Sequence, residues 1–156
     1  MTGTHDPAQD PDEHVRYAHY QRLFAEVAPA EAAALVIRVL TDPDRSMANS
    51  AVCGYLDHRA AALLTDPQFP AWQREMAGPV AVDDFSTRRL TEWALLRAVT
   101  LDEAWSAEEL LAASNWLQLR LAETSTSPTA LAVLTEGGRT RRIRNIAHSR
   151  SSRGRR

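Results

Sequence analysis

Apolar residues recur along most of this chain at intervals of three and four, the spacing that places them on one face of an α-helix. Polar residues, prolines and glycines separate the resulting segments. Alanine and leucine dominate the apolar residues, and both favour helices. The pattern predicts eight helices, over about residues 11–27, 30–41, 43–64, 67–77, 83–100, 106–123, 128–136 and 140–149.

The segments at 11–27 and 35–40 show which residues the pattern predicts to be buried and where a strand is the alternative. In the first, Val15, Leu23 and Val27 share one side, which we expect to be buried. The stretch LVIRVL at 35–40 has a rival interpretation, because its β-branched residues also suit a buried strand. It has no second strand-like segment to pair with, so we expect it to be helical.

Local signals at the helix starts support these boundaries. Ser106 and Glu109 form a capping box, and Trp105 and Leu110 flank it as a hydrophobic staple. Elsewhere an Asp or Ser, which can accept a free N–H of the first turn, precedes a proline, whose missing N–H costs nothing there. Four starts have this form: Asp10-Pro11, Asp42-Pro43, Asp66-Pro67 and Ser127-Pro128.

The C-terminal stretch RTRRIRNIAHSRSSRGRR divides into two parts. Ile143, Ile146 and Ala147 form an apolar stripe, and Thr140 can cap the helix that carries them. We therefore expect a last helix over 140–149, docked on the helices at 106–123 and 128–136. Residues 150–156 contain no apolar side chain and are expected to form a disordered, arginine-rich tail.

These segments predict an all-α protein of seven to eight helices in antiparallel hairpins, arranged as a short solenoid or a compact helical bundle. The chain has 156 residues, which is normal for one domain. We expect residues 1–9 to be disordered and residues 10–149 to form a single helical domain.

Charge is distributed unevenly behind a net value of −2. Residues 1–136 hold ten arginines and all twenty acids, whereas residues 137–156 hold eight arginines and no acid. Cys53 is the only cysteine, so no disulfide within the chain is expected. No stretch approaches the length of a membrane helix and the N-terminus is polar, so we expect a cytoplasmic protein without membrane association.

Two parts of the sequence resemble HEAT-type α-helical repeats. One is VIRVLTDPDRSMANSAVCGYL, with the turn Asp42-Pro43-Asp44; the other is LAVLTEGGRTRRIRNIAHS, with a glycine turn. Together they cover about a third of the chain. The resemblance implies paired antiparallel helices stacked into a curved solenoid, with an adaptor surface on its concave side and no catalysis.

The arginine-rich end suggests phosphate binding, because the guanidinium fork matches phosphate oxygens. The alternative is a solvated basic terminus that balances the acidic body. No aromatic residue is interleaved, so stacking on bases is not expected. The candidate nucleic-acid contacts are Arg139, Arg141, Arg142, Arg144, Arg150 and Arg153.

Candidate catalytic and metal-binding residues do not form a convincing set. His14 and His19 are five residues apart and point about 140° from each other on a helix, unlike a helical zinc pair. Cys53 has Asp57 on its own face, but His58 is turned away from it. We expect no catalytic residue, no metal and no cofactor.

Four tryptophans are many for this length, and most suit core packing. Trp72 is the best candidate for an interface, with Phe69, because their segment is short and bounded by prolines. The sequence therefore predicts a non-catalytic interaction protein, an adaptor or regulator with an unidentified protein partner. The alternative is a nucleic-acid-associated protein that holds phosphates with its C-terminal arginines.

Overall fold

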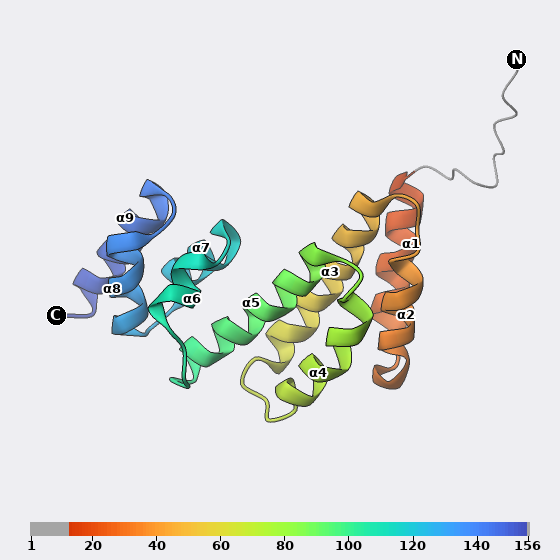
Figure 1. Cartoon of the computed structure of the whole chain (residues 1–156), viewed down its shortest axis with the longest axis horizontal. Helices are drawn as coiled ribbons and strands as arrows, with labels where there is room; N and C mark the ends of the chain where they lie inside the picture. Colours follow the sequence, from red (N-terminus) through yellow and green to blue (C-terminus); the bar gives the residue numbers. More distant parts are fainter. Residues whose placement is uncertain (1–12, 156) are drawn as a thin grey trace, which may run out of the picture. The chain divides into compact units, whose positions relative to one another are not determined.

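Every regular element in the computed structural model, which describes residues 13–155, is helical (Figure 1). The predicted all-α fold is confirmed, with nine α-helices in this range instead of seven or eight. None of these helices is both long and apolar enough to cross a membrane. The elements are α1 (Glu13–Glu26), the 3₁₀ turn η1 (Pro29–Glu31), α2 (Ala32–Val39), α3 (Arg45–Leu63), α4 (Phe69–Val80), α5 (Asp84–Thr100), α6 (Ala107–Ala112), α7 (Asn115–Thr124), α8 (Pro128–Gly137) and α9 (Arg141–Arg153).

The helices group into two compact units, and the single helical domain expected over 10–149 stays a prediction. Unit 1 extends to Leu90 and unit 2 begins at Thr91, so the boundary falls within α5. In unit 1, α1 and α2 pack on α3, and α2 also packs on α4. In unit 2, α8 packs on α6, α7 and α9, and α7 also contacts α9.

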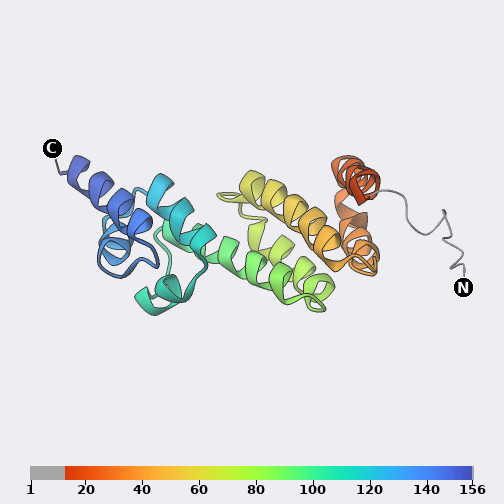
Figure 2. The same ribbon diagram turned by 90° about the horizontal axis from the view of Figure 1, so that it is seen from above.

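The stretch at 35–40 is helical, as expected, and it supplies much of the core of unit 1. Val36 and Val39 on α2 are fully buried, as are Leu56 on α3 and Met76 on α4. Both views place α3 beside the first half of α5 (Figures 1 and 2). The side chains of Cys53 and Ser86 meet there, 3.9 Å apart.

The buried face of α1 was predicted only in part, since Leu23 and Val27 are half-buried but Val15 is not. Val15 is 56% exposed, and Phe24 is the residue of α1 that is buried. The Phe24 ring stacks on Tyr55 of α3, with centroids 4.8 Å apart. The aliphatic stripe was misleading because the aromatic residues of α1 carry more apolar surface to bury than its aliphatic ones.

The turn between α2 and α3 uses its aspartates differently from the prediction. Asp44, not Asp42, caps α3 by accepting the N–H of Met47 at 3.0 Å. Asp42 is buried and accepts the Tyr20 hydroxyl at 2.7 Å, with Arg16 Nε 3.4 Å away. Burial and the Asp42 hydrogen bond raise the pKa of Tyr20. Through its contacts with Tyr20 and Arg16, Asp42 holds α1 against this turn.

The other proline-associated starts had different outcomes. Ser127 caps α8 as predicted, accepting the N–H of Ala130 at 3.2 Å. Asp66 instead accepts from Gln68 within the turn, and α4 begins at Phe69. The helix then continues past Gly78 and Pro79 to Val80, against the expected stop, and Val80 is fully buried. Asp10 lies outside the described residues.

The helix predicted over 106–123 is broken into α6 and α7. Ser106 caps α6 as expected, but Ser114 starts a second helix by accepting the N–H of Leu117. Glu92 of α5 is buried and accepts both the N–H of Ser114, at 2.8 Å, and its hydroxyl, at 2.5 Å. This contact from α5 stabilises the break between α6 and α7. The periodicity of 106–123 does not encode it.

The predicted last helix exists and is longer than expected. Thr140 caps it by accepting the N–H of Ile143, and Ile143 and Ala147 are buried against unit 2. The helix ends at Arg153. Residues 150–153 therefore belong to α9, and no tail begins at residue 150 as predicted. The disorder predicted for residues 1–9 concerns residues outside the described range.

Candidate interaction surfaces

Three of the six candidate arginines donate to carbonyls at helix ends in unit 2. Arg139 donates to the carbonyl of Ala113 (3.3 Å) and Arg144 to that of Gly138 (2.7 Å), which are the C-cap residues of α6 and α8. Arg150 donates to the carbonyl of Ala122, in the last turn of α7, at 3.2 Å. A cation at a helix C-terminus satisfies an otherwise free carbonyl and opposes the helix dipole. These arginines therefore stabilise the fold of unit 2.

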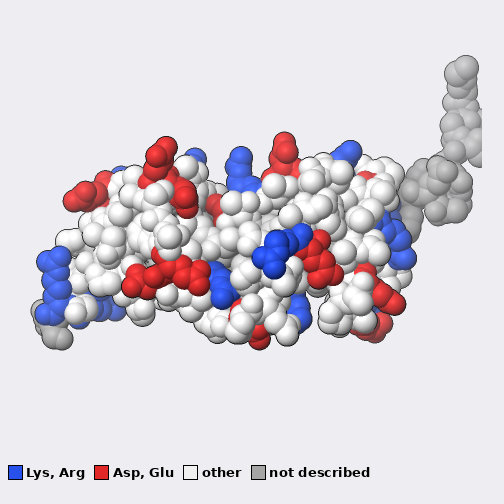
Figure 3. All heavy atoms as spheres, turned by 60° about the horizontal axis from the view of Figure 1, so that its bottom comes forward, with Lys and Arg blue, Asp and Glu red and all other residues white. Residues whose placement is uncertain are grey.

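The other three candidate arginines point to the solvent. Arg141 and Arg153 are exposed, and the Arg142 side chain is 72% exposed. Arg142 lies 3.9 Å from Glu123 of α7, an exposed pair that contributes little to stability. Figure 3 shows basic atoms next to the grey terminal residue, at this end of unit 2. The structure thus divides one run of arginines into a set that donates to helix-end carbonyls, of which Arg139 is still exposed, and a set that projects into the solvent.

The two candidate interface aromatics lie in the core of unit 1. Phe69 is 1% exposed and Trp72 is 7% exposed, and their rings contact each other with centroids 5.6 Å apart. Neither ring is presented at the surface, which corrects the assignment of these residues to an interface. Their segment is a full helix, α4, with one face against α2, and this is what buries them.

The nucleophile-like set around Cys53 does not come together either. Cys53 is buried, and burial raises the pKa of its thiol. Asp57 pairs with Arg89 of α5 at 3.6 Å, while His58 lies on the exposed side of α3. Among residues 13–155 no three His, Cys, Asp or Glu side chains form a group that could hold a metal ion.

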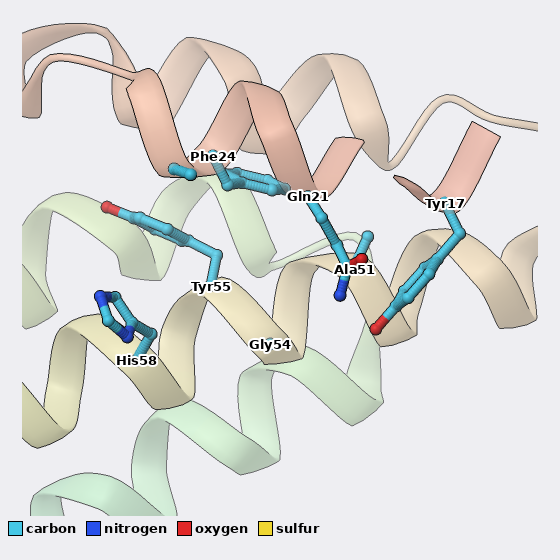
Figure 4. A pocket seen from close by; sticks show the side chains of 8 residues that line it. Tyr17, Gln21, Phe24, Ala51, Gly54, Tyr55 and His58 are labelled. Atoms are coloured by element: carbon cyan, nitrogen blue, oxygen red, sulfur yellow. The ribbon is translucent and has the colours of Figure 1, made fainter. Parts of the chain in front are cut away.

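A hollow between α1 and α3, of about 300 Å³, was not foreseen from the sequence (Figure 4). At about 30 Å³ for each molecule, its volume equals that of roughly ten waters, within the lower range of ligand pockets. The stacked rings of Phe24 and Tyr55 form one wall in Figure 4, and Tyr17 lies at the other end. The lining residues are Tyr17, Gln21, Phe24, Ala25, Ala51, Gly54, Tyr55 and His58.

Polar groups lie at the edge of this aromatic hollow. Gln21 of α1 and His58 of α3 are exposed residues that line it, as Figure 4 shows. Within the described part of the chain, neither side chain has a hydrogen-bond partner. An apolar wall with a few polar groups around it is the usual composition of a binding site.

Gly54 keeps the middle of the hollow open. It lies within α3, its backbone is helical, and no described glycine has a positive φ angle. A β-carbon built on it would meet no atom within 4 Å. Neither backbone conformation nor packing therefore requires glycine at this position.

No family model, curated protein or solved structure matches this chain. One signal in the sequence points to the hollow, a glycine in the middle of a long helical segment; that Tyr17 and Tyr55 face each other across the hollow is seen only once α1 packs on α3. The pairing of α1 with α3 could not be deduced from periodicity within either helix.

Proposed function

We propose that this chain is a non-catalytic interaction protein whose hollow between α1 and α3 binds a segment of a partner protein. The observation that carries the proposal is the open hollow over Gly54. A glycine inside a helix costs about 0.5–1 kcal/mol relative to alanine. Neither packing nor backbone conformation within this chain requires glycine at residue 54. A ligand that contacts the backbone of α3 at this position would explain why the glycine is there.

The chemistry of the walls defines the ligand as one bulky apolar side chain of an extended or helical segment. Phe24 and Tyr55, each 9% exposed and stacked on each other, and the half-buried Tyr17 line the hollow with apolar surface, which suits an aromatic or branched aliphatic anchor. Gln21 and His58 can hydrogen-bond to the backbone on either side of that anchor. Interfaces of this kind draw most of their affinity from one or two such anchors.

The resemblance to HEAT-type repeats is in keeping with this proposal. Its two segments correspond to α2 and α3, joined by the turn at 40–44, and to α8 and α9, which pack on each other. That family implies an adaptor function without catalysis. The hollow, however, lies between α1 and α3, so the proposed site rests on geometry and not on the family.

Replacing Gly54 with alanine should stabilise unit 1 by about 0.5–1 kcal/mol, because alanine is the better helix former and its methyl group meets no atom. Urea unfolding would measure the change in free energy directly. In thermal unfolding, each kcal/mol should raise Tm by about 2–4 °C. Gly78→Ala is the control: Gly78 also has free space, but it precedes Pro79, which disfavours the helical conformation for any residue with a β-carbon. It should gain less than Gly54→Ala. A destabilised Gly54→Ala protein would show that the glycine is structurally required.

The binding proposal can be tested with a displayed library of random peptides selected on the full chain. We expect enriched peptides to share an aromatic or large aliphatic anchor. Gly54→Trp fills the hollow and should weaken the selected peptides at least tenfold. Gly78→Trp places the same ring on α4 and should leave binding within about twofold. The proposal would be contradicted if the selected peptides bound Gly54→Trp and Gly78→Trp equally well. It would also be contradicted if the selection enriched no peptides with an aromatic or large aliphatic anchor.

A further inference from the structure

We propose that the solvent face of α9 binds the phosphate backbone of duplex DNA, independently of the hollow in unit 1. We define this face as the exposed residues of α9, on the side of the helix that is not packed against unit 2. It contains hydrogen-bond donors, no acid and no apolar residue: Arg141, Arg142, Asn145, His148, Ser149, Ser152 and Arg153.

Packing holds this face in a defined position. Ile143 and Ala147 are buried on the opposite side of the helix, and Arg144 and Arg150 are fastened to the ends of α8 and α7. The accessible arginines therefore project from a supported helix, and less side-chain and backbone entropy is lost on binding than in an unstructured basic tail. Arg141 and Arg153 are about 18 Å apart along the helix, at 1.5 Å per residue.

These features favour DNA over other polyanions. A B-form major groove, about 12 Å wide, admits an α-helix and so brings its arginines to the phosphates on both edges, whereas the narrow, deep major groove of an RNA duplex does not admit one. A membrane-surface helix inserts its apolar face into lipid, but Ile143 and Ala147 are already buried in unit 2. The face carries no aromatic residue to stack on unpaired bases, so backbone contact is the expected mode.

An acid beside this face does not block such contact. Glu123 of α7 shares a shallow groove with Ser149, Arg150 and Arg153, and it lies 3.9 Å from Arg142. The Glu123 and Arg142 side chains are 47% and 72% exposed, so their attraction is largely screened by water. A phosphate can therefore replace the carboxylate as the partner of Arg142 at little cost.

The test is fluorescence anisotropy of the full chain with a labelled 20-base-pair duplex of random sequence, at 50–200 mM salt. Three neutralised phosphates predict a slope of about −2.7 in log K against log salt, which is about 40-fold weaker binding across this range. The triple variant R141Q/R142Q/R153Q should lose at least tenfold in affinity at 50 mM salt and flatten the slope. Its helical content, measured by circular dichroism, should be unchanged, because none of the three arginines is buried.

A matched control removes three exposed arginines from unit 1. The variant R45Q/R74Q/R88Q has the same change in net charge and should bind the duplex within about twofold of the unmodified chain. Equal losses in both variants, or none in either, would overturn the proposal, since the affinity would then reflect overall charge or another surface. Stronger binding to an RNA duplex of equal length, or to anionic phospholipid vesicles, would overturn it in favour of those ligands.

Discussion

Replacing Trp93 with alanine should lower the free energy of unfolding of unit 2 by about 4 kcal/mol, in the range measured for large aromatic residues truncated in protein cores. Trp93 of α5 is fully buried. Its ring meets Trp116 of α7 edge to face, with centroids 5.5 Å apart, and the guanidinium carbon of Arg120 lies 4.7 Å from its centroid. Truncation removes the apolar burial, the ring contact and the cation–π contact together.

Urea unfolding followed by circular dichroism would measure the loss, and hydrogen exchange would localise it to residues 91–155. Trp93→Phe keeps an aromatic ring and should recover part of the stability. Trp105→Ala, at a half-buried position before α6, should cost less than half as much as Trp93→Ala. A loss below about 1 kcal/mol for Trp93→Ala would mean that unit 2 is not packed around this ring.

Replacing Gln118 with leucine should cost about 3 kcal/mol, although the two side chains are similar in size. The Gln118 side chain is fully buried in α7. Its Nε2 donates to the carbonyls of Leu110 at 2.9 Å and Leu111 at 3.2 Å, and its Oε1 accepts the N–H of Arg139 at 2.8 Å. Leucine leaves the part-buried carbonyl of Leu111 and N–H of Arg139 without this partner, and each such loss costs about 1–3 kcal/mol; the Leu110 carbonyl still accepts the N–H of Ala113.

Unfolding experiments on Gln118→Leu and Gln68→Leu would separate this effect from the general cost of removing an amide. Gln68 is exposed at the start of α4, so its replacement should change stability by less than about 0.5 kcal/mol. In hydrogen exchange, the Arg139 amide should lose protection in Gln118→Leu. Unchanged protection there would show that water or another group takes over the role of Gln118.

The sequence alone was informative where structure depends on neighbours along the chain. The capping residues Ser106, Ser127 and Thr140 act as predicted, because an N-cap contact spans only three residues. Ser114 could have been recognised in the same way, since serine before a helical segment favours an N-cap. The apolar spacing continues through it, however, and predicts one unbroken helix over 106–123.

Gln118 and Gly54 show why the buried hydrogen bonds of α7 and the hollow between α1 and α3 were missed. From sequence, Gln118 is indistinguishable from the exposed Gln68, because both are polar residues next to apolar ones. Only the fold brings the end of α6 and the turn before α9 to its amide. Gly54 resembles an ordinary weak point in a helix until α1 is packed beside it.

By itself, then, the sequence determined that the chain is helical, approximately where most of its helices begin and end, and that cationic charge gathers at its C-terminal end. These properties follow from hydrogen bonds and side-chain spacings that span a few residues. Tertiary structure decided that there are two units, that Arg139, Arg144 and Arg150 cap helices while Arg141, Arg142 and Arg153 stay accessible, and that a hollow lies over Gly54. Each of these depends on groups that are distant along the chain or on helices packed together, and spacing within a single helix does not encode such contacts.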